Sequence, residues 1–321
     1  MSQDSSSAEP SGTRADAHGT IALVSGATSG IGAATAEALA RLGWTVVLVG
    51  RNRLRCESAV ARIRHATGND QTDYVLADLS SQSGVRHAAR DFLARYDELH
   101  VLVNNVGGLF LNRRESSDGI ELTLAVNHLA AFLLTNLLLP VMLRSEPARI
   151  VNVSSAGHRL SHGLRRDDLQ WRRGFYRGFQ AYHQSKLANL LFTGELSRRL
   201  ASSRVTVNAV GPGLVATNIG KDNRWYWRML KPAVDMALNH RFVSADEGAQ
   251  TVIYLATSPD VAKVTGKYFV DGAAVPPSAA ARDVESARWL WGVSEELTGW
   301  TAEPVDNLHL SDRGDSPVAH P

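Results

Sequence analysis

Short apolar runs alternate with longer helix-like segments along most of this 321-residue chain. The runs that are typical of buried strands lie at 20–25, 45–49, 72–77, 99–103, 148–154, 204–210 and 266–270. The segments with helical spacing or helix-forming composition lie at 30–42, 53–67, 81–95, 118–143, 180–202 and 245–257. Strands that alternate with helices predict a parallel sheet with helices on both faces. We therefore predict an α/β fold in a single domain.

The two ends of the chain differ from this pattern. The first 18 residues are rich in Ser, Asp, Ala and Gly and have no apolar core, which argues against a signal peptide or a membrane anchor there. We predict a disordered tail at 1–18, a domain at 19–302 and a flexible polar tail at 303–321. An amphipathic segment at 284–297 is expected to pack back onto the domain.

A glycine-rich turn follows the first apolar run. Gly26-Ala-Thr-Ser-Gly-Ile-Gly32 comes directly after Ile21–Ser25, and Ala33–Leu42 is a strong helix former. A glycine turn between strand and helix lets the backbone approach a pyrophosphate, which the free amides and the positive end of the helix dipole attract. The context predicts a dinucleotide site. A glycine turn without a ligand is the less favoured alternative.

Tyr182 and Lys186 stand four residues apart in a segment of helical pattern, so their side chains lie on one face. A free phenol loses its proton at about pH 10, and a nearby cation lowers that pKa. Five of the 34 basic side chains are lysines, and Lys186 is the first of them along the chain. The spacing indicates a tyrosine acting as acid or base. By itself it is equally compatible with a surface pair.

Together with further motifs in order, these segments resemble the short-chain dehydrogenase/reductase superfamily, and within it the retinol dehydrogenase-like branch. The resemblance spans roughly residues 19 to 300. The further motifs are Ala77-Asp-Leu79, Asn104-Asn-Val-Gly107, Val126-Asn-His128, Ile150–Ser155 and Gly211–Thr217. Ser25 stands where the family usually has Thr, and Val106 where it has Ala. The resemblance implies a Rossmann doubly wound sheet of seven parallel strands in the order 3-2-1-4-5-6-7, with the cofactor across their carboxyl ends.

The resemblance also implies roles for single residues. Tyr182 is the general acid or base, supported by Lys186, and Ser155 donates to the substrate oxygen. Ser155 is preferred to Ser154 because the family's serine is the second of the pair. Asn127 is implied to keep a water next to Lys186, with capping of a local carbonyl as the alternative.

The expected cofactor site is larger. Asp78 is implied to accept from the adenine amine, Asn104 and Gly107 to line the ribose, and Thr217 to hold the carboxamide. The full cofactor-binding set is Gly26, Ser29, Gly30, Ile31, Gly32, Arg51, Asp78, Leu79, Asn104, Gly107, Tyr182, Lys186, Pro212, Gly213 and Thr217. No metal site is predicted. His128 and His158 lie close to the motifs and are assigned no role.

The choice of nicotinamide cofactor is predicted from the end of the second strand. An NAD site normally has an acid there for the ribose 2′-hydroxyl, and no acid occurs between Leu42 and Glu57. Arg51, with Arg53 as a second candidate, would instead meet a 2′-phosphate through its guanidinium fork. We predict NADP(H). A solvated arginine at a helix start is the alternative.

Two segments are candidate covers for a substrate. Residues 156–181 form an unusually long connection from Ser155 to Tyr182, and 218–241 carries aromatic side chains. Such side chains line pockets for apolar ligands, although 218–241 equally fits a core cover or a subunit contact. The predicted substrate is a bulky apolar carbonyl or alcohol: a ketone, an aldehyde, a retinoid or a polycyclic compound.

Composition limits which partners and which cellular compartment are expected for the protein. The net charge of +2 and the 32 acids argue against nucleic acid, and the single cysteine, Cys56, fits a reducing compartment. We predict a cytoplasmic enzyme without a membrane anchor, with a homo-oligomer left open. The predicted function is an NADP(H)-dependent oxidoreductase that transfers hydride. The alternative is a non-catalytic NADP-binding regulator, for which the intact set of Asn127, Ser155, Tyr182 and Lys186 would have no use.

Overall fold

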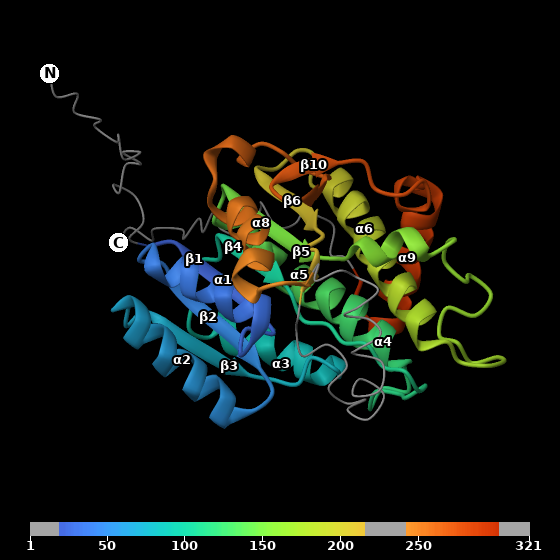
Figure 1. Ribbon diagram of the computed structural model, residues 1–321, viewed down its shortest axis with the longest axis horizontal. Coiled ribbons are helices and arrows are strands. Elements are labelled where there is room, and N and C mark those ends of the chain that lie inside the picture. The colour runs from blue at the N-terminus through green and yellow to red at the C-terminus, as the bar shows by residue number, and fades with distance from the viewer. Residues whose placement is uncertain (1–18, 216–241, 302–321) are drawn as a thin grey trace, which may run out of the picture.

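A computed structural model describes residues 19–215 and 242–301 of the chain. Its centre is a twisted sheet with helices on both faces (Figure 1). The strands of this sheet are β1 (Ile21–Ser25), β2 (Thr45–Gly50), β3 (Thr72–Leu76), β4 (Val101–Asn104), β5 (Ala148–Val153), β6 (Val205–Val210), β9 (Tyr268–Val270) and β10 (Ala273–Val275). Their order across the sheet is β10-β9-β6-β5-β4-β1-β2-β3. A separate parallel pair joins β7 (Leu214–Val215) to β8 (Phe242–Val243).

Helices cover the sheet in two layers. The described helices are α1 (Gly30–Arg41), α2 (Arg53–Thr67), α3 (Gln82–Leu93), α4 (Leu122–Leu124), α5 (Ala130–Arg144), α6 (Gly178–Arg199), α8 (Ala245–Thr257) and α9 (Val284–Thr298). One apolar core joins one face of the sheet to α1, α2 and α8. The core on the other face includes buried side chains of α3, α5, α6 and α9.

The first strand shows why the apolar runs become strands of a central sheet. Leu23 belongs to the core under α3 and α5, whereas Ala22 and Val24 belong to the core under α1 and α8. Successive side chains of a strand point to opposite faces, so a strand covered on both faces must be apolar at every position. The continuous run in the sequence therefore indicates a buried parallel strand.

The predicted strand order is confirmed, with one addition at the edge. Beyond β9 the chain reverses through Asp271 and Gly272, both with positive φ (49° and 75°), and β10 pairs antiparallel to β9. Asp-Gly is a common sequence for such two-residue hairpin turns. Among the described residues the sheet thus has eight strands rather than the predicted seven. The last strand, Ala273–Val275, has little β-branched or aromatic character, so its pattern gave no strand signal.

The helix expected at 118–143 is interrupted. The chain forms α4, then a π-helical turn at Ala125–Leu129 (η1), then α5. The stretch Leu122–Arg144 is long and apolar enough to cross a membrane, but 89% of its most apolar window is buried inside the protein. Its apolar surface therefore faces the core of the fold.

Helix α9 packs back onto the domain, as predicted for 284–297. The Trp291 ring lies edge-on to Phe132 of α5, with ring centroids 5.0 Å apart, and stacks on Phe192 of α6 at 5.9 Å. Below them the Nε2 atom of His128 is 2.8 Å from the Ser294 hydroxyl, which donates to the Leu290 carbonyl. A buried histidine thus links the π-helical turn to α9.

This histidine should make stability depend on pH. Burial lowers the pKa of His128 from 6.5 to about 4. Between these values the unfolded chain binds a proton that the folded protein does not, so stability is complete above about pH 6.5 and falls as the pH decreases toward 4. We expect the free energy of unfolding to be about 2 kcal/mol lower at pH 5 than at pH 7 from this residue alone. Urea denaturation at the two pH values measures it.

Two variants test whether His128 causes this pH dependence of stability. His128→Gln should reduce the pH dependence by the share of this residue and leave the share of His158 and His183, whose pKa values burial also lowers, whereas His65→Gln, at an exposed position on α2, should retain the full dependence. An unchanged slope of unfolding free energy against pH in His128→Gln would contradict the assignment.

Candidate active site

The glycine turn joins β1 to α1 in a conformation that needs glycine. Gly26 and Gly30 have φ of +66° and +59°, and a Cβ on Gly32 would lie 2.6 Å from the Gly26 carbonyl oxygen. Ser29 precedes α1 as its N-cap, and Ile31 is buried under the turn. The first-turn amides of α1 lack carbonyl partners within the helix. The turn therefore provides a site where an anionic group can approach the backbone.

A buried hydroxyl ties this turn to the end of β4. Ser25 Oγ donates to the Val103 carbonyl at 3.2 Å and accepts from the amides of Asn105 at 2.9 Å and Val106 at 3.1 Å. The Asn105 side chain in turn donates to the carbonyl oxygens of Ser25 and Gly26. Two loops of the sheet edge are thereby held in one fixed arrangement.

The side chains of the paired asparagines point to different partners. The Asn104 side chain is buried and donates to Thr135 Oγ1 at 2.8 Å and Asn152 Oδ1 at 2.9 Å, inside the core. The backbone of Asn104 is therefore the part that is left to line a cofactor ribose, and that expected role stays a prediction. Asn105, which sequence reasoning passed over, shapes the glycine turn. In the sequence, the second asparagine of the Asn-Asn pair was the feature that could have pointed to this role.

Tyr182 and Lys186 lie on the same face of α6, as their spacing predicts. The Lys186 ammonium is 5.6 Å from the centre of the Tyr182 ring and donates to the Val153 carbonyl at 3.2 Å. Burial lowers the pKa of Lys186 to about 8. Burial is also the largest influence on Tyr182 and raises its pKa, while a hydrogen bond with the Ser155 side chain lowers it. The expected lowering by the lysine does not dominate, because burial removes hydration from the phenolate.

The two serines after β5 point in different directions. Ser154 is buried and its hydroxyl donates to the Lys186 carbonyl at 2.8 Å. Ser155 is only partly buried and begins a short 3-10 helix, Ala156–Leu160 (η2), where its hydroxyl oxygen accepts from the Gly157 amide at 3.1 Å. The Ser155 side chain meets Tyr182, whereas Ser154 is used to hold α6.

Asn127 lies in η1 and connects the β4 loop to α6. Its Oδ1 accepts from the Gly108 amide at 2.7 Å, and its Nδ2 donates to the Gly108 carbonyl at 3.0 Å and to Ser185 Oγ at 2.9 Å. A Cβ on Gly107 would lie 3.3 Å from Lys186 Nζ and 3.4 Å from Asn127 Oδ1. Glycine therefore lets the loop run directly over both groups. The carbonyl that Asn127 contacts belongs to Gly108, so Asn127 does not cap a carbonyl of its own helix.

The remaining cofactor candidates sit at neighbouring strand ends. A Cβ on Gly50 would be 2.8 Å from Thr28 Cγ2, so the end of β2 runs beside the glycine turn and Arg51 follows it at the surface. Arg53 instead donates to the Tyr74 hydroxyl at 3.2 Å. Asp78 is exposed beyond β3, with Oδ1 accepting from the Ser80 amide at 3.0 Å.

Two candidate groups lie after β6. Gly213 has φ of +77°, following Pro212. Thr217 and the segment 218–241 lie outside the described residues.

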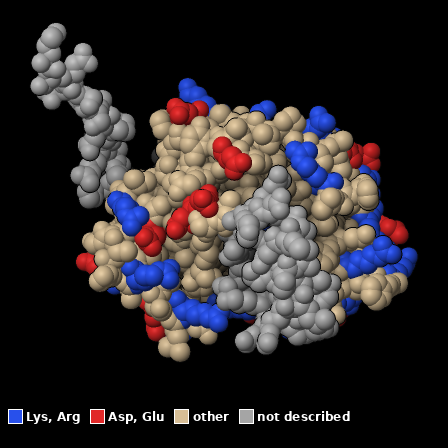
Figure 2. All heavy atoms as spheres, in the orientation of Figure 1, with Lys and Arg blue, Asp and Glu red and all other residues tan. Residues whose placement is uncertain are grey.

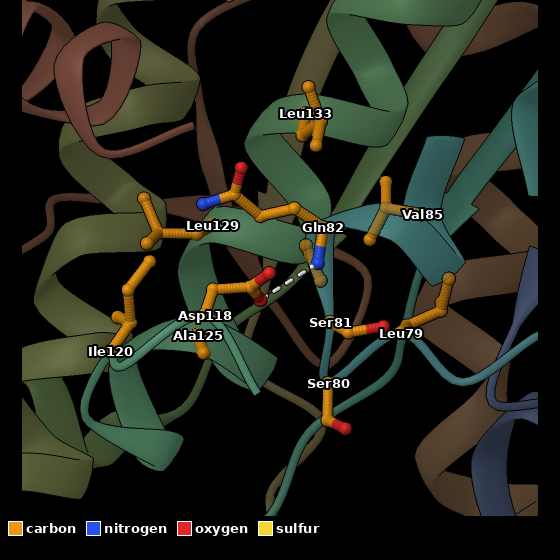
Figure 3. Close-up of a pocket in the computed structure, with 11 residues that line it drawn as sticks. Leu79, Ser80, Ser81, Gln82, Val85, Asp118, Ile120, Ala125, Leu129 and Leu133 are labelled. Atoms are coloured by element: carbon orange, nitrogen blue, oxygen red, sulfur yellow. Dashed lines mark hydrogen bonds between the residues drawn. The ribbon is translucent and has the colours of Figure 1, made fainter. Parts of the chain in front are cut away.

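A small cavity lies to one side of these groups. Leu79, Gln82 and Leu133 line a space of about 10 Å³ between the β3–α3 loop and α5, where the Gln82 amide donates to Asp118 (Figure 3). This volume is at the lower limit for holding a single water molecule, so the cavity is too small for a substrate. Leu79 belongs to its wall and is 5% exposed, which gives it a packing role.

The segment 156–177 follows Ser155 and runs from the end of β5 to the start of α6. Gln184 of α6 accepts from the Arg165 amide and donates to the Leu169 carbonyl, while the Tyr176 hydroxyl donates to Glu121 before α4. These contacts hold the segment against the side of α6. In Figure 1 it forms part of the lime-coloured loop at the right-hand edge.

The chain is similar to known proteins over most of its length. A family model described as enoyl-(acyl carrier protein) reductase matches residues 26–272. Mouse retinol dehydrogenase 12 is 40% identical over 88% of this chain and 87% of its own. An uncharacterized protein from Mycobacterium paratuberculosis aligns with a TM-score of 0.70 and 33% identity over 88% of this chain and 94% of its own. A variant of actinorhodin polyketide ketoreductase, solved with NADPH, aligns with a TM-score of 0.64 and 28% identity over 78% and 95%.

The prediction of a cytoplasmic protein is wrong on these comparisons, because the retinol dehydrogenases that the chain is similar to are membrane-associated. The prediction relied on the composition of residues 1–18 and on the single cysteine. Cys56 is buried and free. A buried thiol carries no information about contact with a bilayer.

The buried ammonium of Lys186 should cost stability. Its pKa of about 8 lies below the unfolded value of 10.5, so stability present above about pH 10.5 is lost as the pH falls toward 8. At pH 7 the loss is complete and on the order of 3 kcal/mol. Lys186→Met removes the charge and also the donor to the Val153 carbonyl, which partly offsets the gain. We expect the unfolding free energy at pH 7 to rise by on the order of 1 kcal/mol.

Chemical denaturation of Lys186→Met measures this change. The matched control is Lys263→Met, at an exposed position, which should change the unfolding free energy by less than about 0.5 kcal/mol. A lower unfolding free energy in Lys186→Met than in the wild type would show that the ammonium stabilises the fold.

Proposed function

Because the chain belongs to the short-chain dehydrogenase/reductase superfamily, we propose that it is an NADP(H)-dependent oxidoreductase acting on a bulky apolar carbonyl or alcohol. Tyr182 is the general acid in reduction and the general base in oxidation. When bound, the nicotinamide supplies or accepts the hydride at its C4 atom. The residues of the chain bind and orient the cofactor and the substrate, and they transfer the proton.

The observation that carries the proposal is the convergence of four polar groups at the carboxyl ends of β4 and β5. The Ser155 hydroxyl meets the Tyr182 phenol, Lys186 lies beneath that ring, and Asn127 braces the loop above the ammonium. Ligands in doubly wound sheets bind at this edge. A protein that only bound the cofactor would not need an acid, a donor and a buried cation around one point.

These contacts indicate how the proton is transferred. The Ser155 oxygen accepts from the Gly157 amide, which leaves its hydroxyl proton to be donated, and a bound substrate oxygen would take this hydrogen bond over from Tyr182. Negative charge develops on that oxygen during reduction, and the Tyr182 phenol gives its proton to it. Lys186 then stabilises the phenolate, since an adjacent cation favours the charged form. The Ser185 hydroxyl, which donates to the Tyr182 carbonyl at 2.7 Å, keeps the turn of α6 in place.

The residues present fit a dinucleotide. The turn Gly26–Gly32 and the start of α1 would hold the pyrophosphate, where a Cβ on Gly32 has no room and the backbone is exposed to an anion. Asp78 would accept from the adenine amine, and Gly107 leaves space beside Lys186. Arg51 would contact a 2′-phosphate, which supports NADP(H) over NAD(H).

An apolar substrate is supported by the relatives and by the surface. The similar curated protein acts on a retinol by its name, and the similar solved structure is a polyketide ketoreductase. On the face in Figure 2, the blue and red charged side chains of the described residues are interspersed. No field of one sign covers the described part of this face that would attract a highly charged substrate.

Replacing Tyr182 by Phe tests the proposed acid. Tyr182→Phe removes one hydroxyl and leaves the ring packing, so turnover should fall by about 10²-fold or more while NADPH binds as in the wild type. Stopped assays of NADPH oxidation with apolar aldehydes and ketones measure turnover, and fluorescence titration measures NADPH binding. Near-normal turnover in Tyr182→Phe would refute the proposed mechanism.

Replacing Arg51 by Ala tests the cofactor preference. Arg51→Ala should weaken NADPH binding by about 1.5–3 kcal/mol, the range for a hydrogen bond to a charged group, and leave NADH binding nearly unchanged. Arg55→Ala is the matched control, at an exposed position one turn further along. Calorimetry with both cofactors decides the question. Equal losses for NADPH and NADH would assign Arg51 a structural role.

A further inference from the structure

His158 is a fully buried histidine three residues after Ser155. It lies in η2, and its ring is edge-on to Tyr268 of β9 with centroids 4.9 Å apart. The proposed proton transfer does not use it. Its contacts nevertheless lead directly to a group that the transfer does use.

Both ring nitrogens of His158 are bonded to backbone groups. The Nε2 atom accepts from the Ser278 amide at 3.2 Å and therefore carries no proton. The Nδ1 atom lies 2.7 Å from the Ser155 carbonyl oxygen, which can only accept, so Nδ1 is the donor. The ring is thus neutral, with its single proton on Nδ1. Burial lowers the pKa of His158 and favours the same neutral form.

These bonds fix the backbone on which the Ser155 hydroxyl is mounted. The Ser155 carbonyl accepts a second hydrogen bond, from the His158 amide at 3.2 Å. The next residue, Arg159, donates to the Pro276 carbonyl, so two consecutive residues tie η2 to the segment 276–278. Among the described residues, no other group donates a hydrogen bond to the Ser155 carbonyl. The ring therefore adds to the hydrogen bonds that restrict rotation of this turn.

We propose that His158 is a positioning residue for the Ser155 hydroxyl. Its Nδ1 proton holds the Ser155 carbonyl, and its Nε2 anchors the turn to Ser278 across 120 residues of sequence. Ser155 then stays aimed at the oxygen that Tyr182 protonates. This inference rests on the proposed function. A shift of about 1 Å in a reacting group can cost about 10²-fold in rate, so an indirect hydrogen bond is enough to affect turnover.

Two substitutions separate positioning from packing. His158→Leu removes both hydrogen bonds, whereas His158→Asn retains a donor near the position of Nδ1. With NADPH and decanal as the assay pair, we expect kcat to fall about 10- to 100-fold in His158→Leu and to recover most of that loss in His158→Asn. The NADPH dissociation constant should change by less than about twofold. Equal kcat values in the two variants would overturn the proposal.

A double-mutant cycle with Ser155→Ala is the decisive experiment. If His158 acts through Ser155, adding His158→Leu to Ser155→Ala should lower kcat by less than about twofold further. A full additional loss in that background would mean that His158 acts by another route. If His158→Leu does not fold, His158→Gln replaces it in the cycle, since its amide reaches toward Ser278 rather than the Ser155 carbonyl.

The same series separates the inference from the function on which it rests. Ser155→Ala alone must lower kcat if the proposed function is correct. Normal turnover in Ser155→Ala would refute the role of the serine, whatever His158 does. Lowered turnover in Ser155→Ala together with wild-type turnover in His158→Leu would refute only the positioning role.

Discussion

The buried hydroxyl of Ser25 is the constraint on which the site depends. At the carboxyl edge of the sheet, β1 continues into a helix on one face and β4 into a loop toward the other, so the chain separates there. Ser25 Oγ closes this separation through three backbone groups, of Val103, Asn105 and Val106. The side chain is completely buried. Without this hydroxyl, the Asn105 amide and the Val103 carbonyl would keep their mutual hydrogen bond at 3.1 Å, but the Val106 amide would lose its partner, at a cost of about 1–3 kcal/mol if it stays buried.

The loop fixed in this way passes over a charge that the fold would be more stable without. Lys186 is 4% exposed, and burial disfavours its ammonium form. Packing alone does not require a cation at this position of α6, since a methionine has a similar length. A buried charge surrounded by Gly107, Asn127 and Tyr182 is more simply explained by chemistry at that point.

The sequence pattern was sufficient for most of the fold because apolar runs of strand length can be covered only by helices on both faces. It was insufficient wherever a role depends on register at a strand end or on a distant partner. Asn104 and Asn105 are neighbours, yet one faces the core and the other the glycine turn. His158 was passed over because its second partner, Ser278, is 120 residues away. The preference for Ser155 over Ser154 came from the family pattern alone, and the structure shows that the Ser154 hydroxyl bonds to α6 while the Ser155 side chain meets Tyr182.

The π-helical turn at Ala125–Leu129 shows how a local irregularity serves the site. A π-turn adds a residue to the helix and weakens its hydrogen-bond ladder, which regular packing would not favour. Here it contains Asn127, whose amide makes three hydrogen bonds to groups outside its own helix, at Gly108 and Ser185. Because Ser185 in turn donates to the Tyr182 carbonyl, one side chain links the loop over the ammonium to the backbone that carries the phenol. The helical defect thus connects the two halves of the site.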